Sequence, residues 1–206
     1  LDCSGSMSKD GKIAALNAAV REALPHLGEV NESNPHAHLL VRVITFSSGA
    51  RWHVATPTPI EELRWTNVTA AGFTDLGEAL DLLRPALESP PMEPDALPPA
   101  IILVSDGMPT DDFAPSLREL LSTTMGSQSM RAAVAIGRDA DRETLSAFMG
   151  GGAQPLSASN PEQLAAALRR ATTRATILAS TLADAELLVK EFGPRLAEES
   201  DGEIAW

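Results

Sequence analysis

The sequence is poor in cysteine and in aromatic residues, and each shortage excludes a class of protein. Its 206 residues include one cysteine and no tyrosine, and aromatic side chains make up only 4% of the chain. A single cysteine cannot form an intrachain disulfide, so we expect a reducing, cytoplasmic compartment. So few aromatic side chains also argue against a platform on which nucleobases stack.

Positive charge and long apolar runs are scarce as well. The chain has 16 Lys and Arg residues against 28 Asp and Glu residues, which gives a formal net charge of −12. This charge repels phosphate backbones and anionic lipids, so we expect neither nucleic acid nor a membrane as a partner. No apolar run approaches the roughly 20 residues needed to span a bilayer. A metal ion, a cationic ligand or a basic protein surface suits this charge better.

Strand patterns alternate with amphipathic helix patterns along the chain, which is typical of an α/β fold. We predict a doubly wound, mostly parallel central sheet flanked by helices (a Rossmann-like arrangement), with one antiparallel edge strand. The predicted strands are 39–46 (buried on both faces apart from Arg42), 51–54 (antiparallel), 100–105, 131–136 and 154–157, and the predicted helices are 13–27, 74–87, 109–121, 141–148 and one from 161 onward. This domain spans residues 1–172, and residues 173–206 are expected to form a helical extension and a polar tail.

Oxygen-bearing side chains gather where three predicted loops follow strands. Asp2, Ser4 and Ser6 alternate at the start of the chain, Thr74 precedes an apolar helical pattern, and Asp106 ends a buried strand. An alternating extended segment holds its side chains on one side, and doubly wound sheets bind ligands at the carboxyl ends of their strands. Hydroxyl and carboxylate oxygens are the ligands that Mg²⁺ and Mn²⁺ prefer. The five residues therefore predict one divalent-cation site.

The mixture of ligand types predicts what such a site does. Hydroxyls are neutral and leave the charge of a cation uncancelled, while the two carboxylates are expected to orient bound waters. A cation held in this way remains electrophilic and keeps one open coordination position. An acidic side chain of another protein can take that position, so the pattern favours recognition of a protein partner that presents Asp or Glu.

At these residues the chain resembles a von Willebrand factor A (VWA) domain with a metal-ion-dependent adhesion site (MIDAS). The family pattern Asp-x-Ser-x-Ser, Thr, Asp is complete as Asp2, Ser4, Ser6, Thr74 and Asp106. The resemblance covers residues 1–172. It implies that the two serines and the threonine bind the cation directly and that the two aspartates act through water. Its first strand normally extends before the first aspartate, so we expect residues upstream of Leu1.

A closer similarity is to bacterial VWA proteins encoded with tellurite-resistance and stress genes. The segments 40–46, 106–112 and 133–137 look like that subgroup. Its members are often encoded beside a protein kinase and a PP2C-type phosphatase. The resemblance therefore implies a cytoplasmic role in stress response or phosphosignalling, with such a kinase or phosphatase as the partner.

Two alternatives stay open. A metal-dependent phosphatase or other hydrolase would use the same cation, but it needs a general base or nucleophile, and no suitable His or Lys lies near the motif in sequence. Cys3 and Lys9 fall short of the Cys-x5-Arg loop of thiol phosphatases, because Lys cannot form the bidentate phosphate contact of Arg. A VWA subunit of a chelatase or AAA-ATPase complex is the other alternative, with the ATPase on a separate chain. We expect a binding module rather than an enzyme.

Residues around the motif have structural interpretations. His36 and His38 lie two apart, but no third ligand accompanies them, so we expect them on the surface. Thr74 is predicted to cap the helix that follows it. Phe73 is expected to pack in the core, with contact to a partner as the alternative. Helix caps are also expected at three further acids, Asp75, Asp111 and Asp112.

Overall fold

The structure is a computed structural model that describes residues 1–33, 38–88 and 96–173. His36 and, beyond Thr173, the predicted C-terminal extension and polar tail lie outside these residues. Among the helices of the described residues, none combines the length and the hydrophobicity of a membrane-spanning segment.

Two separate sheets form the middle of the molecule. The strands β3 (Ala100–Ser105), β4 (Met130–Ile136) and β5 (Leu156–Ala158) form a parallel sheet in the order β3-β4-β5. The strands β1 (Leu40–Ser47) and β2 (Gly49–Pro59) form an antiparallel hairpin. The α/β class with a mostly parallel sheet is confirmed.

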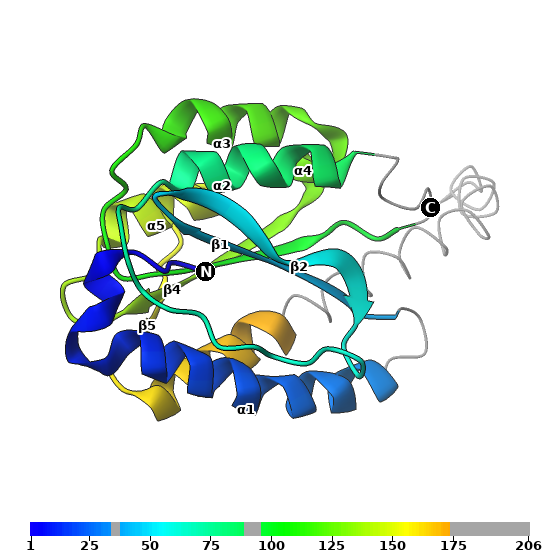
Figure 1. Ribbon diagram of the computed structural model, residues 1–206. Helices are drawn as coiled ribbons and strands as arrows, with labels where there is room; N and C mark the ends of the chain where they lie inside the picture. Colours follow the sequence, from blue (N-terminus) through cyan, green and yellow to red (C-terminus); the bar gives the residue numbers. More distant parts are fainter. Residues whose placement is uncertain (34–37, 89–95, 174–206) are drawn as a thin grey trace, which may run out of the picture.

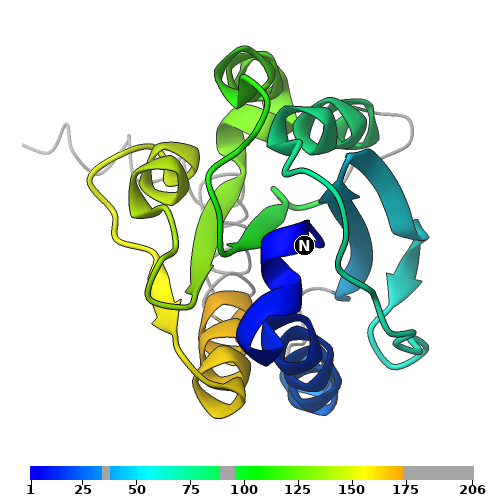
Figure 2. The same cartoon turned by 60° about the vertical axis from the view of Figure 1, so that its left-hand side comes forward.

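Residues 1–3 join the hairpin to the parallel sheet (Figure 2). The backbone N–H of Asp2 donates to the carbonyl oxygen of Val104 in β3 at 2.9 Å, and that of Cys3 donates to Phe46 in β1 at 2.8 Å. Asp2 and Phe46 form a parallel bridge. The first loop of the chain therefore begins where β1 and β3 end, so three chain segments meet at one edge.

Helices cover both faces of the sheets (Figures 1 and 2). One face carries α1 (Lys12–Glu32), which follows the 3-10 segment η1 (Gly5–Gly11), together with a helix over residues 161–173. The other face carries α2 (Leu76–Leu83), η2 (Arg84–Leu87), α3 (Phe113–Ser122), α4 (Thr124–Gln128) and α5 (Arg142–Met149).

The parallel sheet has a hydrophobic core on each face, and successive residues of β3 and β4 pack alternately into one core and the other. Val104 and Val134 pack with α1 and helix 161–173, whereas Leu103 and Ala133 pack with α2, α3 and α5. Side chains alternate across a strand, so a nearly continuous apolar run fills both cores. This is why the sequence pattern of β3 and β4 is uninterrupted.

The first helix is longer than predicted. Its expected end lies near Leu27, but α1 continues to Glu32 with Pro25 inside it. Leu27 packs against Ile60 and Leu63 in a small cluster of its own. These contacts lie beyond Pro25, and they stabilise the five additional residues of the helix, which the missing backbone N–H of the proline disfavours.

The prediction that β1 is buried on both faces is wrong. Only Thr45 and Phe46 are buried, and Leu40 is 52% exposed. Apart from its pairing with β2, the backbone hydrogen bonds of β1 within the described residues join its carboxyl end to residues 1–3 and to Asp75. Arg42 instead lies over the ring of Trp52, 3.7 Å from its centroid.

Candidate functional site

The five predicted site residues converge at the carboxyl ends of β1 and β3. Asp2, Ser4 and Ser6 lie on the first loop, Thr74 on the loop before α2, and Asp106 directly after β3. The exposed fraction is 7% for Thr74, 2% or less for Asp2, Ser4 and Asp106, and intermediate for Ser6. A sequence span of more than a hundred residues thus folds into one polar cluster.

Hydroxyl and carboxylate oxygens form a continuous chain in this cluster. The Oγ atoms of Ser4 and Ser6 are 2.8 Å apart, and Ser6 Oγ donates to Asp106 Oδ1 at 2.7 Å. A Cβ added to Gly107 would lie 3.6 Å from Ser6 Oγ and 4.0 Å from Thr74 Oγ1. The hydroxyls of both residues therefore face the same point beside Gly107.

Asp2 anchors the first loop through both of its carboxylate oxygens. Its Oδ1 accepts a hydrogen bond from Ser4 N–H at 2.8 Å, and its Oδ2 accepts one from the hydroxyl of Ser105 at 2.5 Å. Ser105 is a site residue that the sequence reasoning missed. In the sequence, Ser105 is marked only by its position beside Asp106 at the end of an apolar strand. Its hydrogen-bond partner Asp2 lies 103 residues away.

Backbone hydrogen bonds hold the loop of Thr74 against the first loop. Gly5 N–H donates to Gly72 O at 2.9 Å, and Ala71 N–H donates to Cys3 O at 2.8 Å. A Cβ on Gly5 would lie 3.2 Å from Gly72 O, which is closer than ordinary van der Waals contact. Glycine at position 5 therefore permits this close approach.

Thr74 does not cap α2, contrary to the prediction. The N-cap position belongs to Asp75, whose carboxylate binds Gly49 N–H and the hydroxyl of Thr110, each at 2.8 Å, instead of capping the helix. The backbone N–H of Thr74 donates to Thr110 Oγ1, and Thr110 N–H donates back to Thr74 O, both at 2.9 Å. These bonds fix the backbone of Thr74, whose hydroxyl faces the same point beside Gly107 as the hydroxyl of Ser6.

The other predicted acidic caps have mixed outcomes. Asp112 caps α3 as predicted and accepts a hydrogen bond from Ala114 N–H at 3.3 Å. Asp111 accepts one from Glu78 N–H at 3.2 Å, so it serves the first turn of α2 rather than its own helix. Because this hydrogen bond joins the loop of Asp111 to a different helix, sequence spacing did not reveal it.

Lys12 is a second missed residue, and it is the cation nearest to the acidic end of the cluster. Its Nζ lies 2.6 Å from Asp106 Oδ2 and 3.1 Å from Asp139 Oδ1, with the lysine side chain 6% exposed. Burial alone would lower the pKa of Lys12, but hydrogen bonds to both carboxylates outweigh it and raise the pKa. The same bond lowers the pKa of Asp139. In the sequence, Lys12 stands out only as a basic residue at the N-terminus of a predicted helix, where the helix dipole disfavours a positive charge.

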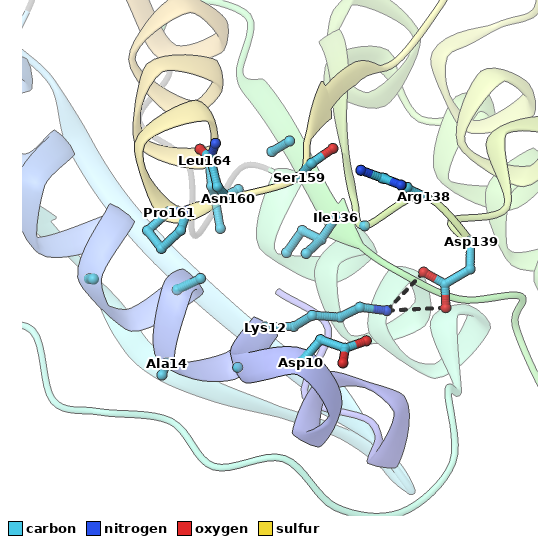
Figure 3. Close-up of a pocket in the computed structure, with 15 residues that line it drawn as sticks. Asp10, Lys12, Ala14, Ile136, Arg138, Asp139, Ser159, Asn160, Pro161 and Leu164 are labelled. Carbon is cyan, nitrogen blue, oxygen red and sulfur yellow. Dashed lines mark hydrogen bonds and ion pairs between the residues drawn. The ribbon is translucent and has the colours of Figure 1, made fainter.

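A cleft of about 690 Å³ adjoins the cluster and shares Lys12 with it (Figure 3). It lies between the start of α1, the loop after β4 and the start of helix 161–173. Its charged groups are those of Asp10, Lys12, Arg138 and Asp139, whereas Ile136 and Leu164 are among its apolar ones. None of the five predicted site residues lines this cleft, so the cluster and the cleft are separate features.

Exposed apolar side chains flank the cluster on two loops. Phe73 is 65% exposed and Met108 is 71% exposed, and each lies two positions or fewer from a residue of the cluster. Among the described residues, Leu40 is the one other large hydrophobic side chain that is exposed. The prediction that Phe73 packs in the core is therefore wrong.

The described residues offer little acid–base or nucleophilic chemistry near the cluster. Cys3 is 4% exposed, and burial raises the pKa of its thiol, which keeps the nucleophilic thiolate scarce at neutral pH. His38 is exposed, as predicted. No group of three or more His, Cys, Asp or Glu side chains able to hold a metal occurs in the described residues.

Comparison with known proteins identifies the fold. No protein-family model and no curated protein sequence matches the chain. Among solved structures, a von Willebrand factor type A protein from Catenulispora acidiphila matches with a TM-score of 0.61 and 20% identity, covering 84% of this chain and 41% of that one. Manganese-loaded TRAP protein from Plasmodium vivax matches with a TM-score of 0.60 and 17% identity, covering 84% and 70%.

A third match is proximal thread matrix protein 1 from the mussel byssus with a zinc-occupied MIDAS motif. Its TM-score is 0.59 at 17% identity, and the match covers 84% of this chain and 45% of that one. The chain spans less than half the length of the Catenulispora and mussel proteins. At these identities the comparisons establish the fold, and the chain has the fold of a VWA domain.

Proposed function

We propose that the chain is a metal-dependent protein-binding module. Ser4, Ser6 and Thr74 bind one Mg²⁺ or Mn²⁺ ion directly, Asp2 and Asp106 act through water, and the ion receives an acidic side chain of a protein partner. The observation that carries this proposal is the oxygen chain from Ser4 through Ser6 to Asp106, with its spacings of 2.8 and 2.7 Å.

The spacing of these oxygens suits a small divalent cation. Octahedral Mg²⁺ binds oxygens at about 2.1 Å, so neighbouring ligand oxygens lie about 3.0 Å apart. The Oγ atoms of Ser4 and Ser6 already lie close to that separation. A bound cation would supply an electrophilic contact atom, while the buried side chains around it restrict solvent.

Two structural neighbours support a cation in this fold. Their descriptions name manganese for the Plasmodium protein and zinc in the MIDAS motif of the mussel protein. In the present chain the donors are oxygens alone, which favours Mg²⁺ or Mn²⁺ over the nitrogen- and sulfur-seeking Zn²⁺.

The exposed residues Phe73 and Met108 suggest what the partner presents. Both lie on loops that carry site residues, and both are largely exposed. An acidic side chain on the cation would bring its sequence neighbours over these two side chains. The partner segment is therefore an Asp or Glu flanked by apolar residues.

A binding role accounts for the local chemistry better than hydrolysis does. A hydrolase needs a group that activates water, and Lys12 is already hydrogen-bonded to two carboxylates while Cys3 is buried. The resemblance of segments 40–46 and 106–112 to the tellurite-resistance subgroup extends the proposal. It favours a cytoplasmic bacterial module in stress response or phosphosignalling, with a protein kinase or PP2C-type phosphatase as the partner.

Calorimetric titration of Mg²⁺ and Mn²⁺ tests the cation site. Wild type should bind one ion, and Asp106→Ala and Ser6→Ala should both bind it far more weakly. Asp112→Asn is the matched control, because it removes an exposed carboxylate from the same loop and keeps a capping side chain. Equal affinity in wild type and both site variants would refute the assignment.

A further inference from the structure

Lys12 places a positive charge inside the proposed cation site. Its ammonium group binds one carboxylate oxygen of Asp106, and the hydroxyl of Ser6 binds the other. The side chains of Lys12 and Asp106 are 6% and 0% exposed. A charge this deeply buried is stable only when it is paired, so Lys12 and Asp106 stabilise each other.

Figure 3 shows the Lys12 side chain extending from the start of α1 toward Asp139. A Cβ added to Gly137 would lie 2.9 Å from Lys12 Cε and 3.2 Å from Nζ, and Gly137 has a positive φ of 86°. A side chain at that position would force the lysine to move. The ammonium group of Lys12 also contacts Asp139, whose side chain is 73% exposed.

We propose that Lys12 is a built-in counter-cation that sets how tightly the site binds its divalent ion, and that Asp139 moderates this effect. The inference rests on the proposed cation site. A divalent ion next to Asp106 would be repelled by the ammonium group of Lys12, because both positive charges lie beside the same carboxylate. Like charges this close in a partly buried site change a binding constant about tenfold or more.

Asp139 acts on the ion through Lys12. Its carboxylate shares the ammonium charge from the cleft side, which reduces the repulsion that an arriving cation meets. Without Asp139, the charge of Lys12 acts on Asp106 alone. Lys12 and Asp139 should therefore change the affinity in opposite directions, an outcome that a merely structural role does not produce.

The test is calorimetric titration of Mn²⁺ into wild type, Lys12→Met, Asp139→Asn and the double variant. Lys12→Met should bind Mn²⁺ about tenfold more tightly or better, and Asp139→Asn should bind it several-fold more weakly. In the double variant, the change at Asp139 should have little further effect, because its path through Lys12 is gone. Melting in the presence of a chelator gives a second readout, in which Lys12→Met melts at lower temperature than wild type and regains stability with Mn²⁺.

Asp10→Asn is the matched control for loss of one carboxylate from the same cleft. Asp10 has a φ of 52°, which Asn tolerates, and the exposed change should leave Mn²⁺ affinity near that of wild type. If Lys12→Met fails to fold, Lys12→Gln, which removes the charge but keeps a hydrogen-bond donor for Asp106, replaces it in the same titrations. Weaker or unchanged binding by Lys12→Met, or equal effects of the two aspartate variants, would overturn the role of Lys12. Absence of Mn²⁺ binding by wild type would overturn the cation site itself.

Discussion

The hydroxyl of Ser105 donates a hydrogen bond of 2.5 Å to Oδ2 of Asp2, although the two residues lie 103 positions apart. Asp2 is fully buried, and its other carboxylate oxygen accepts the backbone N–H of Ser4. The serine at the end of β3 therefore fixes the first loop beside Asp106. The geometry of the proposed cation site depends on a side chain that is not one of its ligands.

Removing this hydroxyl should weaken both the fold and the site. In Ser105→Ala, one buried oxygen of Asp2 loses its partner, which costs about 1–3 kcal/mol of the free energy of unfolding. Urea unfolding measures this loss, and Mn²⁺ titration measures the accompanying loss of affinity. Ser127→Ala is the control, because the hydroxyl of Ser127 is exposed on α4 and far smaller effects are expected. Equal stability of the two variants would contradict the role of Ser105.

The close approach of Gly5 to Gly72 should not tolerate a side chain. Alanine at position 5 places a Cβ 3.2 Å from the carbonyl oxygen of Gly72, and overpacking of this kind costs about 1–3 kcal/mol. The loop of Thr74 should move away from Ser6, so Gly5→Ala is expected to lose Mn²⁺ affinity. In the control Gly28→Ala, the new Cβ meets no atom within 4 Å on α1, and affinity should stay unchanged. Unchanged affinity in Gly5→Ala would show that the loop spacing is not critical.

The thiol of Cys3 should be unreactive in the folded protein. Burial raises the pKa of this thiol, so the reactive thiolate appears only at pH above the usual range for cysteine. Alkylation by iodoacetamide should be slow at neutral pH, rise late as the pH increases, and become fast in urea. Equal rates for native and unfolded protein would contradict the burial of Cys3.

Phe73 and Met108 should affect partner binding without affecting the cation. Serine at either position removes an exposed apolar side chain, which is expected to cost about 1–2 kcal/mol of binding to a partner that covers it. Fluorescence anisotropy with peptides that carry Asp between leucines, compared with Asp between glycines, measures this difference in the presence of Mn²⁺. Leu40→Ser is the control, because Leu40 is exposed on β1 away from the site loops. Equal losses in all three variants would remove the proposed contact surface.

The sequence predicts much of this fold because the parallel strands β3 and β4 are nearly uninterrupted apolar runs, a pattern typical of strands that are buried on both faces. β3 agrees with its prediction to the residue, and β4 begins one residue early. The short helix α4 was missed, since five residues without apolar periodicity give no signal. The outer part of β1 was misjudged, because an apolar composition does not show how many neighbours a strand has.

The candidate site was predicted in part for a similar reason. Its five oxygen-bearing residues stand out because they lie at loop positions after strands, and the structure brings them together. The two residues that organise them were missed. Ser105 and Lys12 each pair with an aspartate about a hundred positions away, and local sequence patterns do not predict contacts over such a separation.

The hydrogen bonds of residues 1–3 have a consequence for how the molecule opens. These residues are bonded to β1 on one side and to β3 on the other, and Ser4 and Ser6 follow them directly. A local unfolding event at this segment would separate the hairpin from the parallel sheet and dismantle the serine loop together. Amide hydrogen exchange at Asp2 and Cys3 should therefore slow when Mn²⁺ binds, because a bound ion makes this opening less frequent.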